Sequence, residues 1–165
     1  MRWSSRGYAV LLFLSLLWIA GFFLPSFLHV FGRTDAALIS RLVYSPVCHQ
    51  DAARSFTLFD WPLSVCHRCA AIYLSFAAVL LLFPLLRRSR LFDSLALSRL
   101  AIFIVPMILD YVLDVFGIWH NSAVSRSISG IIAGAGLALF TVPAWMELWT
   151  LRGRSISHTH TEAAS

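Results

Sequence analysis

The 165-residue sequence contains no lysine, and charged residues make up only 13% of it. Soluble domains carry about a quarter charged and about half apolar residues, whereas 59% of this chain is hydrophobic. This composition excludes an ordinary soluble enzyme and a disordered tail. Three cysteines are too few for a disulfide-stapled domain. The length allows one domain, so we expect a single all-α polytopic membrane protein.

Four apolar stretches are long enough to cross a hydrocarbon core as helices, which takes about 17–25 residues. A lipid-exposed backbone must satisfy its hydrogen bonds internally, so helix is the expected state of all four. The first stretch is too long for a cleaved signal peptide and has no small-residue cleavage site, so we expect it to be retained. The sequence therefore predicts four transmembrane helices at about 8–30, 70–86, 97–118 and 127–151, and a disordered tail at 152–165.

The arginines predict the orientation of the spans. They form no basic stripe interleaved with aromatic residues, which argues against a nucleic-acid partner and leaves the lipid bilayer as the expected one. Basic residues favour the cytoplasmic side. With the N-terminus inside, eight arginines are internal and five external, so we expect an inner-membrane protein with both termini cytoplasmic and an outer loop at 31–69. The internal ones are Arg2, Arg6, Arg87, Arg88, Arg90, Arg99, Arg152 and Arg154.

The outer loop at 31–69 is too short and too polar to bury a core of its own. Thr34 or Asp35 is expected to cap a short amphipathic helix resting on the membrane surface through Ala37, Leu38 and Leu42. The stretch 55–65 partly alternates between apolar and polar residues and contains a turn signal. It predicts a hairpin that delivers two cysteines to the start of the second span.

All three cysteines, Cys48, Cys66 and Cys69, lie in this loop. The Cys-x-x-Cys spacing lets two sulfurs reach one ion, and an arm with Cys48 and His49 completes a three-sulfur, one-nitrogen set typical of zinc or another thiophilic metal. A metal would also supply folding energy to a thin loop. Because adjacent residues tend to point apart, the fourth ligand stays open between His49 and Asp110, Asp114, His67 or water. An open position would support metal-assisted hydrolysis, and a closed one would be structural.

The same cysteines are compatible with redox chemistry. A Cys-x-x-Cys pair at a helix N-terminus favours thiolate, helped here by Arg68. Such a pair on the oxidising membrane face is similar to that of quinone-coupled disulfide-forming proteins. Those proteins use a second cysteine pair, and here one cysteine remains. A non-catalytic assembly or sensor subunit is a third hypothesis, and the sequence leaves self-association or a membrane partner open.

Four motifs together resemble a signature, CHQ…RS…VCxRC…GIY, of an uncharacterised prokaryotic family of integral membrane proteins. They are Cys48-His49-Gln50, Arg54-Ser55, Val65-Cys66-His67-Arg68-Cys69 and Ile72-Tyr73. The resemblance covers about residues 45–135 and continues through Pro106, Asp110, Asn121, Arg126, Gly130 and Gly134. Two residues depart from it, because Ala71 and Tyr111 stand where the family has glycine. The resemblance implies that the cysteines act as a set and says nothing of a substrate.

Two acidic residues of the third span, Asp110 and Asp114, are four apart and share one helix face. A rise of 1.5 Å per residue places them about 12 and 6 Å beneath the outer end of the span. Arg126 opens the fourth span at the same level, which predicts an Asp–Arg pair. Because charges are costly there, we expect Asp110, Asp114 and Arg126 to form the catalytic floor of the site, with a structural lock between helices as the alternative.

Three further features of the spans and their connections are expected to be structural. Gly130 and Gly134 form a small-xxx-small step that favours close helix packing. His120 lies in the short outer loop before the fourth span, where we expect it to be solvated. Glu147 lies near the inner end of that span, within reach of the arginines that follow it.

Overall fold

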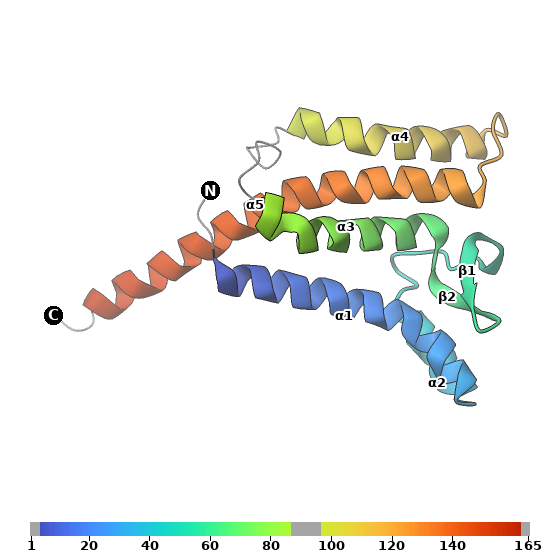
Figure 1. The fold of residues 1–165 in the computed structure, drawn as a ribbon, viewed down its shortest axis with the longest axis horizontal. Helices are drawn as coiled ribbons and strands as arrows, with labels where there is room; N and C mark the ends of the chain where they lie inside the picture. Colours follow the sequence, from blue (N-terminus) through green and yellow to red (C-terminus); the bar gives the residue numbers. More distant parts are fainter. Residues whose placement is uncertain (1–3, 87–96, 163–165) are drawn as a thin grey trace.

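The computed structural model describes residues 4–86 and 97–162 and is mostly helical (Figure 1). Among the described residues, three helices are long and apolar enough to cross a membrane: α1, α3 and α5. The fold is not all-α as expected, because the loop after α1 contains a two-stranded antiparallel sheet. The same loop also contains the short helix α2. The elements are α1 (Ser5–Val30), α2 (Thr34–Leu42), a 3-10 turn (Ala52–Arg54), β1 (Ser55–Leu58), β2 (Trp61–Cys66), α3 (His67–Leu86), α4 (Leu97–Val115) and α5 (Ala123–Glu162).

The long helices lie side by side with the small elements at one end. Helix α3 packs between α1 and α5, and α4 packs on the other side of α5 (Figure 1). Both chain termini lie at the end opposite the hairpin. Helix α5 continues to Glu162, so helix replaces the disordered tail that we expected at 152–162. That stretch contains no proline to stop the helix.

Helix α4 lies outside the set of three because of its charged residues. The third predicted span, at 97–118, is found as a helix that ends at Val115. The helix contains Arg99, Asp110 and Asp114. Almost every stretch of it that is long enough to cross the membrane includes all three charged residues, which gives it more charges than the corresponding stretches of α1, α3 and α5. The internal arginine cluster at 87–90 lies outside the described residues.

Helix α1 turns back into the loop at a glycine. Ser4 caps its start by accepting a hydrogen bond from the backbone N–H of Gly7. Pro25 lies inside the helix, where a missing N–H favours the bend visible toward its end (Figure 1). The helix ends at Val30, and Gly32 follows with a φ of +69°, a conformation that suits glycine.

Helix α2 forms as predicted, but its cap and its buried face differ from the prediction. Arg33 is the N-cap residue and makes no side-chain capping bond, so neither Thr34 nor Asp35 fills that role. Ala37 is fully buried because α2 packs against α1. Leu38 and Leu42 are exposed on another face of the helix together with Ile39 and Val43.

The contact between α3 and α5 depends on two glycines. A Cβ on Gly130 would lie 2.6 Å from the carbonyl oxygen of Arg68 and 2.9 Å from the Cβ of Ala71. A Cβ on Gly134 would lie 2.3 Å from the carbonyl oxygen of Ile72. The predicted small-xxx-small packing is therefore confirmed. Ala71, one of the two departures from the expected signature, does not prevent the approach, because Gly130 provides the space.

The predicted hairpin is confirmed between β1 and β2. Leu58 pairs with Trp61, and the two turn residues, Phe59 and Asp60, both have positive φ, at 54° and 59°. Two positive φ values are typical of a type I′ turn, whose twist matches that of the strands. Strand β2 runs directly into α3 at His67, so the hairpin fixes the position of Cys66.

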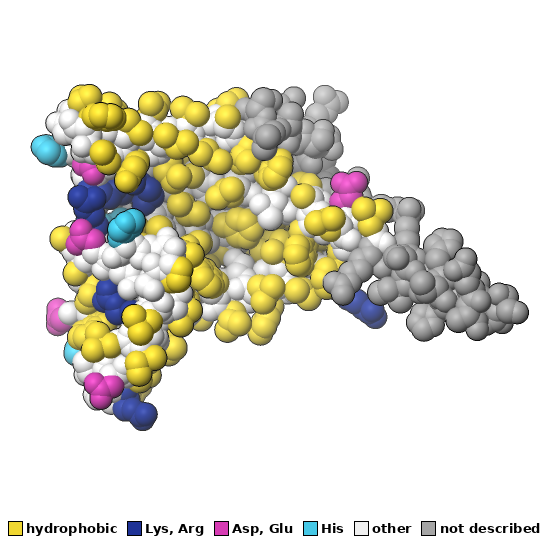
Figure 2. Space-filling view, turned by 180° about the vertical axis from the view of Figure 1, so that it is seen from behind, with side chains coloured by type: hydrophobic (Ala, Val, Ile, Leu, Met, Phe, Trp, Pro, Cys, Tyr) yellow, Lys and Arg dark blue, Asp and Glu magenta, His cyan; other side chains and the backbone are white. Residues whose placement is uncertain are grey.

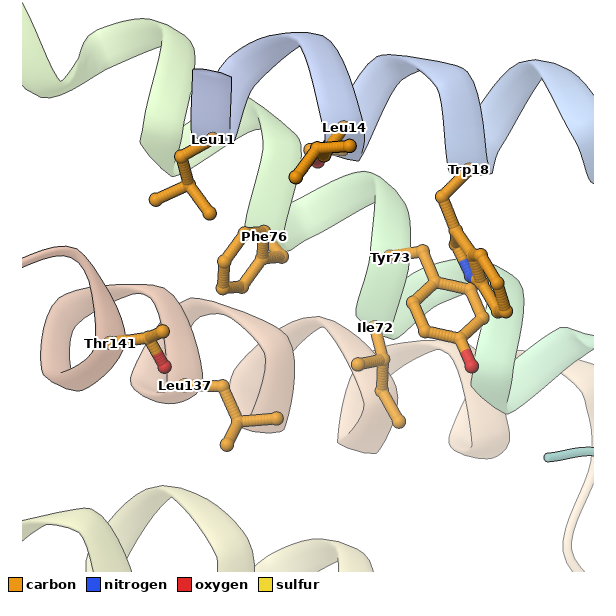
Figure 3. Close-up of a pocket in the computed structure, with 9 residues that line it drawn as sticks. Leu11, Leu14, Trp18, Ile72, Tyr73, Phe76, Leu137 and Thr141 are labelled. Carbon is orange, nitrogen blue, oxygen red and sulfur yellow. The ribbon is translucent and has the colours of Figure 1, made fainter. Parts of the chain in front are cut away.

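An apolar pocket of about 430 Å³ lies between α1, α3 and α5 (Figure 3). The rings of Trp18 and Tyr73 lie against each other at one end of it, with centroids 5.8 Å apart. Both rings also pack on the buried cluster beneath the loop, formed by Phe22, Tyr44, Cys48, Leu63, Val65 and Ala70. The buried residues of the loop therefore pack against side chains of α1 and α3, which agrees with the prediction that the loop is too short to bury a core of its own.

Candidate metal centre and adjoining arginine pocket

The sulfur atoms of Cys48, Cys66 and Cys69 all lie within 4.8 Å of one another. The three cysteines form no disulfide. Two thiolates bound to one tetrahedral zinc at about 2.3 Å lie about 3.8 Å apart, so the side chains need to move by only about 1 Å to bind. The predicted convergence of the sulfurs is therefore confirmed as geometry, and the donor set fits a thiophilic ion.

The sulfur of Cys48 accepts hydrogen bonds in this group. The backbone N–H of Cys66 donates to it at 3.2 Å. Hydrogen bonds from the Cys66 and Cys69 thiols lower the pKa of the Cys48 thiol far below its ordinary value, although burial acts in the opposite direction. The arrangement therefore favours thiolate at Cys48, which is the form that binds metals.

Gln50 fixes the arm that carries Cys48. Its φ of 53° turns the chain sharply, and its side-chain amide donates to the carbonyl oxygens of Arg41, at 2.6 Å, and Ser64, at 2.9 Å. Arg41 in turn donates to the carbonyl oxygens of Gln50 and Pro62. These bonds tie the end of α2 to β2. The glutamine of the Cys-His-Gln motif therefore holds the first cysteine beside the other two.

Tyr44 connects the same arm to α1. Its hydroxyl donates to the carbonyl oxygen of Trp18 at 2.7 Å, and burial raises the pKa of this phenol. The hydroxyl reaches the helix because a Cβ on Gly21 would lie 2.2 Å from it. Tyr44 also accepts a backbone hydrogen bond from Cys48 at its carbonyl oxygen, at 3.0 Å. The first cysteine is thus anchored to a candidate span.

His49 does not join the sulfur group. In the part of the chain that the structure describes, the three cysteines are the residues whose ligand atoms all lie within 4.8 Å of one another. His49 is exposed, since consecutive residues point apart, yet it lines the pocket beside the sulfurs. The other candidates for the fourth ligand, His67, Asp110 and Asp114, also lie outside the group.

This pocket has a volume of about 340 Å³ and contains three arginines. They come from three separate segments: Arg54 from the 3-10 turn, Arg68 from the start of α3 and Arg126 from the start of α5. Figure 2 shows that charged side chains gather at the end of the molecule that carries the loop. The pocket is lined by Val47, Cys48, His49, Asp51, Arg54, Cys66, Arg68, Cys69, Tyr111 and Arg126.

Asp110 lies behind this pocket and is surrounded by donors. Arg68 donates to its carboxylate, as do Asn121 at 3.2 Å and Ser125 at 2.9 Å. Ser129 adds a longer contact at 3.4 Å. The carboxylate is therefore saturated, and it fixes the guanidinium of Arg68, a residue that lies between Cys66 and Cys69 in the sequence.

Asp114 lies one turn further along α4 and faces two guanidinium groups. Its carboxylate is 3.7 Å from Arg54 and 3.9 Å from Arg126, and it accepts the backbone N–H of Asn121 at 3.2 Å. The predicted pair with Arg126 is confirmed. Neither Asp110 nor Asp114 lines the pocket, so both reach the cysteine region through arginines.

Sequence reasoning missed Arg54 and Arg68 as partners of the two acids. The signal was present, because two acids in an apolar span require cations, and Arg68 stands at the mouth of the neighbouring span. It also missed Asn121, which donates to Asp110 and accepts from Arg126. A catalytic role for Asp110, Asp114 and Arg126 stays a prediction.

The comparisons with known proteins agree that the chain is a membrane protein. The family model described as "Predicted membrane protein (DUF2085)" matches residues 48–140, which is more than half of the chain and begins at Cys48. The chain is also similar to the "Uncharacterized protein MJ1492" of Methanocaldococcus jannaschii, with 27% identity over 149 residues that cover 87% of this chain and 96% of the relative. No solved structure matches. The family match confirms the expected resemblance to an uncharacterised family of membrane proteins: the chain belongs to the DUF2085 family of predicted membrane proteins.

Proposed function

We propose that the protein binds a metal ion, zinc, through Cys48, Cys66 and Cys69 on the extracytoplasmic side of the membrane. The observation that supports this most strongly is the mutual distance of the three sulfurs, within 4.8 Å. Three thiols from two separate arms are brought together by dedicated contacts, among them those of Gln50. Such a donor set binds zinc in preference to hard cations such as magnesium.

The fourth position decides what the metal does. A protein ligand there makes the site structural, whereas a water molecule there has its pKa lowered by the ion and becomes a nucleophile for hydrolysis. The open pocket beside the sulfurs favours access from outside. In a hydrolytic site Arg126 faces the pocket directly, and Asp110 and Asp114 act by holding the arginines.

We further propose that α4 crosses the membrane in addition to α1, α3 and α5, which gives four transmembrane helices. Its 19 residues extend about 28 Å. Its two acidic charges are compensated, because Asp110 is paired with Arg68, and Asp114 faces Arg54 and Arg126. Both termini are then cytoplasmic in the inner membrane, and the hairpin is outside, as the arginine distribution predicts.

Elemental analysis tests the metal site. The purified wild-type protein should contain about one zinc per chain, and Cys66→Ser should contain almost none. His49→Ala tests the fourth ligand, with His120→Ala as its matched control, since His120 is an exposed histidine outside the pocket. Less than about half an equivalent of metal in the wild type would overturn the proposal.

The same preparation tests the redox alternative. Quinone-coupled thiol–disulfide exchange by Cys66 and Cys69 requires a reducible disulfide in the native protein. Trapping of free thiols before and after reduction counts that disulfide. Three permanently reduced cysteines together with bound zinc would exclude redox exchange. A native disulfide in a protein without metal would overturn the zinc proposal and support redox exchange.

Labelling of intact cells tests the orientation. Thr57→Cys places a thiol in the hairpin, and Ser5→Cys places one at the start of α1. A membrane-impermeant maleimide should label the first variant more than the unmodified chain in intact cells, and the second variant more than the unmodified chain only after permeabilisation. The unmodified chain serves as the blank. The reverse pattern would overturn the orientation.

A further inference from the structure

The pocket beside the cysteines has an excess of positive charge on its walls. Three arginines line it, and Asp51 is the one acidic residue among its lining residues. Arg68 and Arg126 are mostly buried, with side chains only 16% and 13% exposed. Burying two guanidinium groups at one site is costly unless their donors are used.

The acids behind the pocket use only part of the arginine donors. A guanidinium carries five N–H groups. The Nε atom of Arg68 is buried without a hydrogen-bond partner. The Nε of Arg54 faces Asp51 at 3.4 Å, and that of Arg126 donates to Asn121. The terminal nitrogens of these two arginines, however, lie 3.7 and 3.9 Å from Asp114, which is longer than a hydrogen bond. Asp110 and Asp114 therefore position the guanidinium groups and leave donors for a ligand in the pocket.

We propose that this pocket binds a phosphoryl group, either as free phosphate or in the headgroup of a phospholipid. Guanidinium forks match phosphate oxygens in geometry and charge, and three forks from three segments suit a tetrahedral anion better than a planar carboxylate. The volume of about 340 Å³ falls within the range of about 300–1,000 Å³ typical of ligand sites.

The site adjoins the proposed metal, and this part of the inference rests on the proposed function. The pocket that holds the arginines is also lined by all three cysteines. A phosphoryl oxygen in it therefore lies beside the position that His49 leaves open in the sulfur group. The substrate class for a hydrolytic site here is a phosphate ester, which water splits into an alcohol and a phosphate, and free phosphate binds as the product of that reaction.

Arg54 offers the sharpest test because its side chain is 52% exposed and its loss should not unfold the protein. Arg33, exposed in the turn before α2 and outside the pocket, provides the matched control. Inorganic phosphate is titrated calorimetrically into detergent-solubilised protein. We expect the wild type and Arg33→Gln to bind it equally and Arg54→Gln to bind it at least about tenfold more weakly. Arg54→Lys should fall between them, because it keeps the charge and loses the fork.

A second arm distinguishes the two sources of the phosphoryl group. The protein is placed in nanodiscs of phosphatidylcholine alone or with phosphatidic acid, and the unfolding temperature is measured for the same variants. Stabilisation by phosphatidic acid that Arg54→Gln loses and Arg33→Gln keeps identifies a lipid headgroup, and phosphate binding alone identifies a free anion. Equal behaviour of the two variants with both probes, or no binding by the wild type, would overturn the proposal.

The metal content of the same samples separates this inference from the proposed function. Arg54→Gln should keep its zinc, since Arg54 is not a ligand. Phosphate binding through Arg54 in a protein without metal would refute the zinc site and leave the anion pocket standing. If the protein contains zinc but Arg54→Gln does not weaken phosphate binding, the anion pocket is refuted and the zinc site stands.

Discussion

Arg68, one of the two residues between Cys66 and Cys69 at the start of α3, donates a hydrogen bond to Asp110 near the C-terminal end of α4. The two side chains are 16% and 11% exposed, so the pair is largely shielded from solvent. Because Gly130 lets the backbone of Arg68 approach α5, this one pair connects three helices. It also fixes the segment on which Cys66 and Cys69 lie.

Asp110→Asn should destabilise the protein strongly. The amide keeps a hydrogen bond to Ser125 but leaves the charge of Arg68 buried without a counter-ion, which costs about 3 kcal/mol. Thermal unfolding in detergent measures the loss. Asp60→Asn is the control, since Asp60 is exposed in the hairpin turn and asparagine tolerates its positive φ. Equal unfolding temperatures of the two variants would contradict a structural role for the pair.

Gly134→Ala should force α3 and α5 apart. The new methyl group would meet the carbonyl oxygen of Ile72 at 2.3 Å, and backbone atoms cannot move aside as a flexible side chain can. Overpacking of this kind costs about 1–3 kcal/mol. Ile131→Val, on the exposed face of the same helix, should change the unfolding temperature little. A variant at Gly134 as stable as this control would show that the helices are not in contact there.

The hairpin and the glycine contacts were predictable because each depends on residues close in sequence or on a short repeat. The convergence of the three sulfurs was predictable for the same reason, since Cys-x-x-Cys spacing and one turn bring them together. The partners of Asp110 and Asp114 were not. They depend on the rotation of α3 and α5 about their axes, and the apolar surfaces of these helices have too little asymmetry to set that rotation. Ala37 was placed on the wrong face of α2 because its burial comes from α1.

Asp60→Gly should stabilise the hairpin. Asp60 has a φ of 59°, a conformation that costs an L-residue about 1 kcal/mol and costs glycine little. A β-branched residue is strained there, so Asp60→Val provides the opposite comparison. Hydrogen exchange of the β1 and β2 amides should slow in the first variant and accelerate in the second. The same change in both variants would refute the assignment of the turn.

Removal of the metal by a chelator should destabilise the wild-type protein. A site saturated with zinc a thousandfold above its dissociation constant stabilises the folded state by about 4 kcal/mol. For a chain of this length that corresponds to about 10 °C in unfolding temperature. We therefore expect a chelator to lower the unfolding temperature of the wild type by this amount and to leave Cys66→Ser unchanged.

Re-addition of individual ions then tests the donor set. Zinc should restore the unfolding temperature of the chelated wild type, whereas magnesium should not, because thiolates bind hard cations poorly. His120→Ala should respond as the wild type does, since that residue lies outside the sulfur group. A chelator effect of equal size in Cys66→Ser would mean that the ion binds elsewhere. In that case the three sulfurs, although they lie together, would not be its ligands.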